Sequence, residues 1–273
     1  MPPISDAAFA RALRPAGWLV IALPLAIVAF LIRGALPALS EYGVGGFVAS
    51  ATWAPTSGQV GLLKPIAGTF VATLGAMAIA APLSVAYAVW VHAFAGRWAA
   101  PLRMVVSTMA GIPSVVFGLC ALLTVVPVLL RFAAPGLGVG AAVVVLVAMV
   151  LPVASEAADA AIAQVDSDVV TAARGLGLGA CDAMRVAVLP LASRGIRAGL
   201  LLATGRAIGE TMAVMMVAGN TIAWPTTLAT PFRTLTGNVA IEMAYATGLH
   251  RSALFVGGVV LLALVGCFAA VRR

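Results

Sequence analysis

The stretch GRAIGETMAVMMVAGN, residues 205–220, carries two full charges inside a long apolar run. The charges belong to Arg206 and Glu210, and the whole chain is 63% hydrophobic and only 9% charged. A soluble domain is about a quarter charged. The composition therefore predicts an all-helical membrane protein, in which lipid is the main solvent and two buried charges need a specific explanation.

Apolar runs long enough to cross a bilayer, which takes about 20 helical residues, recur along the chain. We expect six membrane-spanning helices, over residues 18–36, 66–91, 104–130, 137–155, 196–219 and 252–271. Basic residues before the first run would also suit a cleavable signal peptide, but its length and the lack of an A-x-A site favour a retained span. The segments 37–64 and 221–250 are predicted as polar loops.

The distribution of basic residues predicts the orientation. Six spans place both termini on one side, and that side would hold ten basic residues: Arg11, Arg14, Arg97, Arg103, Arg174, Arg185, Arg194, Arg197, Arg272 and Arg273. The other side would hold five: Arg33, Lys64, Arg131, Arg233 and Arg251. The positive-inside rule then predicts a multi-pass protein of the cell (inner) membrane with cytoplasmic N- and C-termini. The net charge of +7 is therefore explained mainly by the excess of basic residues on the predicted cytoplasmic side. Because the arginines are scattered singly along the chain, nucleic-acid binding is disfavoured.

The two charges in the fifth predicted span would lie deep in the membrane. Counted from Ile196, Arg206 is roughly 15 Å and Glu210 roughly 21 Å along a helix. Their i, i+4 spacing predicts a shared face on which they can pair. Such charges normally face the bundle interior or a water-filled cavity. Two GxxxG units in the same helix, at 195–199 and 205–209, predict close approach of another backbone.

Two interpretations of these charges stay open. The pair can serve packing alone, as buried ion pairs often do. Alternatively, it belongs to an anion route, because a guanidinium offers planar donors that suit oxyanions. The candidate pathway residues are Arg206, Glu210, Thr211 and Asn220. Hydroxyl and amide side chains such as those of Thr204, Thr211 and Asn220 are weaker candidates, because each can bond to the neighbouring backbone instead.

The predicted cytoplasmic segment between the fourth and fifth spans has its own organisation. Asp166, Ser167 and Asp168 offer helix caps before an apolar-periodic stretch, and a glycine-rich bend at 175–179 follows. Asp182 and Arg185 then lie three apart on a second short helix, which we expect to end at 189–190. The segment is predicted to form a compact knob of two short helices, with 178–181 at its tip.

This segment resembles the cytoplasmic EAA loop of permease subunits of ATP-binding-cassette importers, here residues 165–195. In that family the pattern is EAA, three residues, Gly, nine residues and I-x-LP, and two positions depart from it: Thr171 replaces the glutamate and Ala187 the isoleucine. The resemblance implies that residues 176–186 are a coupling helix that docks into the ATPase subunit. The implied coupling residues are Thr171, Ala172, Ala173, Gly177, Leu178, Gly179, Ala180, Asp182, Leu189 and Pro190.

A narrower resemblance covers residues 58–265. GRAIGETMAVMMVAGN, AGIPSVVFGL at 110–119 and TGLHRSALF at 247–255 are similar to segments of the PstC-type permease subunit of phosphate importers. The resemblance implies a type I importer bundle, with an N-terminal tail, first span and extracytoplasmic loop in 1–65 and a five-helix core in 66–273. It also implies phosphate as cargo, with sulfate or molybdate as alternatives. The implied partners are a PstA-like second permease, a PstB-like ATPase dimer and a PstS-like extracytoplasmic phosphate-binding protein.

Other classes of function fit the sequence less well. It has no GxxxxGK[ST], HExxH or G-x-S-x-G, which predicts a non-catalytic subunit that relies on a separate ATPase. A self-contained ion-coupled transporter or channel would need a carboxylate relay, yet Glu210 is essentially the one carboxylate of the predicted spans. The three cysteines lack metal spacing, and no cofactor is expected. His92 and His250 are interpreted as interfacial residues, and Glu156 and Asp159 as solvated or capping groups at the end of the fourth span.

Overall fold

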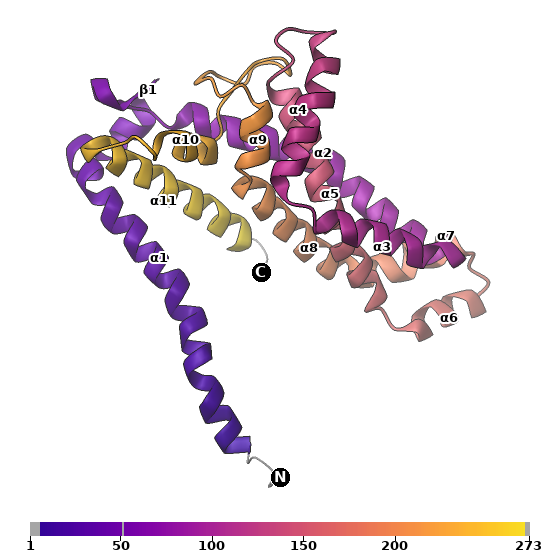
Figure 1. Ribbon diagram of the computed structural model, residues 1–273. Coiled ribbons are helices and arrows are strands. Elements are labelled where there is room, and N and C mark those ends of the chain that lie inside the picture. Colours follow the sequence, from indigo (N-terminus) through magenta and orange to yellow (C-terminus); the bar gives the residue numbers. More distant parts are fainter. Residues whose placement is uncertain (1–5, 51, 271–273) are drawn as a thin grey trace.

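The computed structural model describes residues 6–50 and 52–270, and Figure 1 shows an elongated bundle of helices with little strand. The α-helices are α1 (Asp6–Ala49), α2 (Leu63–Ala93), α3 (Ala99–Ala110), α4 (Ser114–Leu130), α5 (Val139–Ala163), α6 (Ser167–Gly175), α7 (Ala180–Ala183), α8 (Leu189–Gly209), α9 (Met212–Val217), α10 (Leu235–Glu242) and α11 (Gly248–Ala270). The strands β1 (Trp53–Ala54) and β2 (Gln59–Val60) form a small antiparallel hairpin. The end of the sixth predicted span, Val271, and the basic residues Arg272 and Arg273 lie outside the described residues.

The predicted all-helical membrane bundle is confirmed. Five helical segments of the described chain are long and apolar enough to cross a membrane: those containing α1, α2, α5, α8 and α11. The pair α3–α4 qualifies as a sixth if it counts as one broken span. This pair follows the whole length of α5, because Arg103 of α3 contacts Asp159 near one end of α5 and Leu129 of α4 lies against Gly140 at the other.

The third expected span, 104–130, is not one continuous helix. The axes of α3 and α4 meet at 93°, and the break falls at Gly111–Pro113. Pro113 is the N-cap of α4, with an extended ψ of 138°. Its ring removes a backbone donor and disfavours helical geometry at the preceding Ile112. Proline inside an apolar run therefore ends one helix and starts another here.

The boundaries of the predicted loops also need correction. Helix α1 continues through nearly half of the first predicted loop, to Ala49, with one non-helical residue, Gly43, at φ +61°. Helix α5 continues eight residues past the predicted end of its span, to Ala163. The second predicted loop contains the short helix α10.

Small residues set the packing of the bundle centre. Helix α2 lies along α5, with alanines of both helices fully buried between them. Helix α8 crosses α5 so closely that a Cβ on Gly195 would lie 2.8 Å from the Cβ of Ala161, and a Cβ on Gly199 would clash with Ala157. The predicted GxxxG contact at 195–199 is thus present. In lipid, such close packing replaces the hydrophobic effect as the main source of helix association.

Helix α1 stands apart from this centre and packs mainly on α11 (Figure 1). A Cβ on Gly34 would lie 2.6 Å from the ring of Phe255, so the glycine admits the aromatic side chain. Most of α1 is otherwise exposed on this chain. Helix α1 therefore contributes little to the bundle centre formed by α2, α5 and α8.

Candidate functional site

Helices α6 and α7 lie in the segment between α5 and α8 and form the compact knob that the sequence predicted. The Asp166 carboxylate caps α6 by accepting a hydrogen bond from the backbone N–H of Asp168 at 3.0 Å. Gly177, at φ +84°, makes the turn that the sequence predicted, and such a turn favours glycine. Four residues of regular α-helix, α7, follow the turn and lead into a π-helical stretch, Met184–Val188.

The second knob helix does not end at Leu189–Pro190, as the sequence suggested. Residues Ala180–Gly209 form one 30-residue helical segment, which joins α7 through the π-helical stretch to α8. Pro190 falls in the first turn of α8, where the missing N–H matters least. Helix α7 is therefore continuous with the span that carries Arg206.

The predicted coupling residues divide into anchors and an exposed surface. Ala173 is the buried residue of α6, and Met184 and Val188 of the π-helical stretch pack in one cluster with Ala158 and Ile162 of α5. Thr171, which stands where the family has glutamate, donates a hydrogen bond from its hydroxyl to the Ser167 carbonyl. The exposed residues of this segment include Leu176, Gly177, Gly179, Cys181, Asp182 and Arg185.

The fifth predicted span breaks where its carboxylate lies. Helix α8 ends at Gly209, and Glu210 has an extended ψ of 130°. Glu210 Oε1 accepts from the backbone N–H of Ala213 at 3.3 Å, so the side chain caps α9. Its carbonyl accepts the Thr236 hydroxyl at 2.9 Å. The expectation of one continuous helix over 196–219 is therefore wrong. The Glu210 carboxylate and the Thr236 hydroxyl satisfy backbone groups at the break, so the chain can leave helical geometry there.

The break separates the two predicted partners. Arg206 and Glu210 are not among the ion pairs found in the described residues, since they no longer share a continuous helix face. Arg206 is exposed on this chain and lines an apolar groove of about 440 Å³ between α5, α8 and α11. A Cβ on Gly209 meets nothing within 4 Å. A Cβ on Gly205 would meet only the Val265 side chain, at 3.9 Å, so the second GxxxG unit has no close backbone partner within the described chain.

The remaining pathway candidates bond to nearby backbone. The Thr204 hydroxyl donates to the Leu200 carbonyl and the Thr211 hydroxyl to the Gly209 carbonyl. Asn220, with a left-handed φ of +53°, donates from Nδ2 to the Met215 carbonyl at 2.8 Å. These bonds stabilise the backbone around the α8–α9 break.

A buried polar network that the sequence did not reveal lies at the opposite end from α6 and α7. Glu242 of α10 pairs through Oε1 with Arg233 at 2.6 Å, and its Oε2 accepts from Trp53 Nε1 at 2.7 Å and contacts His250 Nε2 at 2.8 Å. Arg233 also donates to the Asn220 carbonyl at 3.0 Å. One carboxylate thus joins the hairpin, α10, α11 and the loop after α9.

The sequence carried only a faint signal for this network. Arg233 and Glu242 both stood in a predicted loop, and His250 was interpreted as an interfacial residue. Trp53 is 189 positions away from Glu242. Only the packing of α1 and the hairpin against α10 and α11 brings these side chains together.

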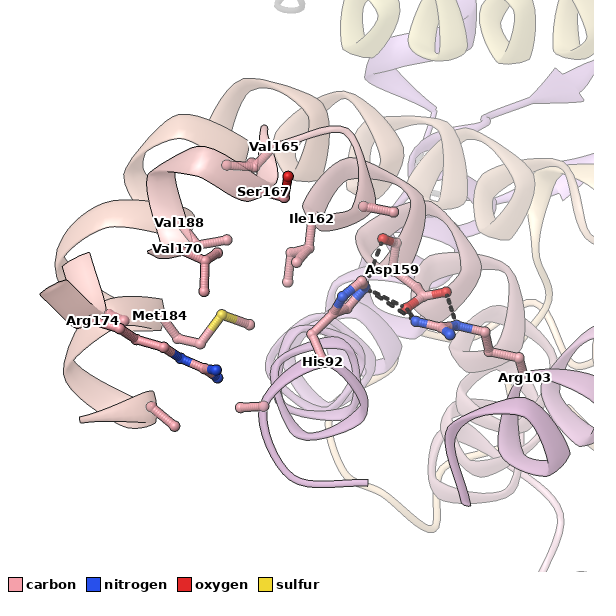
Figure 2. A pocket seen from close by; sticks show the side chains of 14 residues that line it. His92, Arg103, Asp159, Ile162, Val165, Ser167, Val170, Arg174, Met184 and Val188 are labelled. Carbon is pink, nitrogen blue, oxygen red and sulfur yellow. Dashed lines mark hydrogen bonds and ion pairs between the residues drawn. The ribbon is translucent and has the colours of Figure 1, made fainter. Parts of the chain in front are cut away.

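A second cluster, shown in Figure 2, joins three helices at the α6–α7 end. Asp159 of α5 binds Arg103 of α3 through both carboxylate oxygens, at 2.8 and 3.0 Å, and His92 of α2 at 2.8 Å. Asp159 was expected to be solvated or to cap its helix, and it is instead the centre of an ion-pair cluster. This cluster fixes the broken span to the core.

The fold, together with the α6–α7 segment between α5 and α8, defines the class of protein. A chain of the MetNI methionine ABC transporter in an inward-facing conformation has the same fold, with a TM-score of 0.57 and 19% identity over 81% of this chain and 96% of that one. The family model described as binding-protein-dependent transport system inner membrane component matches residues 82–272. The chain belongs to this family and is a multi-pass, non-catalytic permease subunit of an ATP-binding-cassette importer.

Curated relatives support a narrower grouping. The phosphate transport system permease protein PstC of Mesorhizobium japonicum is 31% identical over 99% of this chain and 89% of its own length. PstC of Xylella fastidiosa (strain Temecula1) is 32% identical over 94% and 85%, respectively. PstA 2 of Mycobacterium bovis is 36% identical over 58% of this chain. The similarity to PstC proteins thus extends over nearly the whole chain.

Proposed function

We propose that this permease translocates inorganic phosphate into the cell. The observation that carries the proposal is the similarity to PstC proteins over 99% of the chain, including the segment around Arg206. An oxyanion suits a guanidinium that stands beside an apolar groove, because the charge there has no competing carboxylate partner within the described residues. Sulfate or molybdate is the alternative cargo.

The proposed route runs along the face of α8 that this chain leaves uncovered. A guanidinium facing lipid would cost roughly 2.5–3.5 kcal/mol on insertion scales, so this face needs a polar or protein neighbour. A PstA-like second permease would supply it, with its backbone close to Gly209 and the route between the two subunits. Glu210, Thr211 and Asn220 would shape the end of the route where α8 breaks.

The proposed orientation places α6 and α7 in the cytoplasm together with both termini. A PstB-like ATPase dimer would bind the exposed surface around Cys181 and Asp182, and its closure would move the 30-residue segment Ala180–Gly209. A PstS-like receptor would deliver phosphate to the opposite end, near the hairpin and α10. In this division residues 1–65 are an accessory span with its loop, and 66–273 the core.

Reconstituted uptake tests the cargo. The chain, its companion permease and the ATPase would be placed in proteoliposomes, with loaded receptor outside the vesicles. We expect ATP-dependent uptake of labelled phosphate that excess sulfate or molybdate does not inhibit. Arg206→Gln should abolish most uptake, whereas Arg197→Gln on the same helix should not. Uptake of sulfate in preference to phosphate, or full activity of Arg206→Gln, would contradict the proposal.

A further inference from the structure

A cavity of about 500 Å³ separates the α6–α7 knob from the rest of the bundle (Figure 2). The ends of α2 and α5 and part of α3 form one wall, and α6, α7 and the π-helical stretch form the other. Its volume falls in the range of about 300–1,000 Å³ that is typical of small-molecule pockets. The cavity shares no lining residue with the groove beside Arg206.

The charges around this cavity favour an anion. Its one carboxylate, Asp159, is already engaged by Arg103 at both oxygens and by His92 at one. Arg174 of α6 also lines the cavity, and Figure 2 shows its guanidinium pointing across the gap toward α2. Within residues 13–50 and 52–270, no hydrogen bond or ion pair involves the Arg174 side chain.

Further donors lie on both walls. Arg103 uses Nε and Nη2 for Asp159, and its Nη1 has no hydrogen-bond partner in the described part of the chain. Ser167, the first residue of α6, also lines the cavity. Hydrogen bonds from arginine to phosphate are charge-assisted and strong, and excess positive charge favours a phosphate group. The two arginines outnumber the single, already paired carboxylate.

We propose that this cavity binds a phosphate group, either free orthophosphate from the cytoplasm or the headgroup of an anionic lipid. The bound group bridges Arg174 on the knob and the Arg103 side of the bundle. Because the two walls belong to the coupling segment and to the core, the bridge holds α7 in place and resists its movement. A role in slowing transport when phosphate accumulates inside rests on the proposed function; the binding site itself does not.

A fluorophore on Cys181 of α7 reports this site directly. The full chain, with Cys120 and Cys267 changed to serine, is labelled and placed in phosphatidylcholine nanodiscs, and orthophosphate is titrated against potassium chloride of equal ionic strength. We expect a saturable fluorescence change with orthophosphate alone. Arg174→Gln should raise the half-saturating concentration about tenfold or more. Arg174→Lys should restore part of the response, and Arg194→Gln, outside the cavity, should respond as the parent chain does.

The lipid source is tested in parallel. If the headgroup is the ligand, exchange of phosphatidylcholine for phosphatidylglycerol shifts the signal without added phosphate, and Arg174→Gln removes that shift. A response equal to that of potassium chloride in both lipids, or an Arg174→Gln chain that responds as the parent does, overturns the proposal. If reconstituted uptake fails while the Arg174-dependent signal persists, the proposed cargo is wrong and the site stands.

Discussion

The hydroxyl of Ser252 on α11 donates a hydrogen bond to the carbonyl of Gly34 on α1 at 2.7 Å. The same hydroxyl accepts from the backbone N–H of Ala38 at 2.9 Å. These are the two backbone groups that pair directly in a regular helix, and Pro37 lies beside them. A side chain from a neighbouring span can satisfy backbone groups that lose their helical partner near a proline. Ser252 therefore satisfies two backbone groups of α1 and links α1 to α11.

Ser252→Ala should therefore loosen α1 without unfolding the core. We expect a loss of about 1 kcal/mol in the free energy of unfolding, as for other interhelical hydrogen bonds in membranes. Unfolding of the purified chain by sodium dodecyl sulfate measures this. Thr108→Ala is the control, because the Thr108 hydroxyl donates only to the Met104 carbonyl of its own helix. Equal effects of the two changes would refute the bridge.

Glu242→Gln should destabilise the opposite end of the bundle much more. It removes the charge that balances the largely buried Arg233, and breaking such a pair from one side costs about 3–5 kcal/mol. Trp53→Phe should cost less, because it removes one hydrogen bond and keeps the charges. Limited proteolysis across residues 50–62 would detect a released hairpin. Glu41→Gln, at an exposed carboxylate, should leave cleavage unchanged.

The same substitution at two glycines of α8 should have very different effects on stability. Gly199→Ala should cost about 1–3 kcal/mol, because its new Cβ would clash with Ala157. Gly209→Ala should leave the stability of the isolated chain nearly unchanged, because its Cβ would meet open space. Detergent unfolding of both variants tests this. The double change Gly199→Ala with Ala157→Gly should recover most of the loss; failure to recover would show that the close approach is not the cause.

Cys181 offers a test of orientation and coupling without any added cysteine. The residue is exposed on α7. With Cys120 and Cys267 changed to serine, a membrane-impermeant maleimide should label it in inside-out vesicles and not in right-side-out cells. Binding of the ATPase should slow the labelling at least severalfold. Labelling from the outside would reverse the proposed topology, and undiminished labelling in the assembled transporter would remove α7 from the ATPase interface.

Local sequence patterns predicted the helices well wherever the pattern extended over many turns. The apolar runs located α2, α5 and α11, and the Asp166 cap and Gly177 turn located the knob. The close contact at Gly195–Gly199 is present as expected. It was predictable because the missing Cβ of a glycine can be read directly from the sequence. Hydropathy is insensitive to bends, however, so it did not separate α3 from α4 or α8 from α9.

The candidate site was predictable only in part. The sequence marked Arg206 and Glu210 as exceptional charges, but their assumed pairing depended on a helix that stops at Gly209. Nothing in the spacing could indicate that Asp159 would join Arg103 and His92, which are 56 and 67 positions away. Arg174 was counted as a topology signal, and its place at the edge of a cavity follows from the fold of the knob.

By itself the sequence determined that the chain is a bundle of apolar helices with a knob of short helices between the fourth and fifth predicted spans. Hydropathy, caps and glycine turns act within a few residues, and this short range makes them readable along a single chain. Only the tertiary structure decided which charges meet: Glu242 gathers Arg233, His250 and Trp53, while Arg206 is left without Glu210. Electrostatic contacts act over a few ångströms in space, and that neighbourhood exists only after the helices have packed.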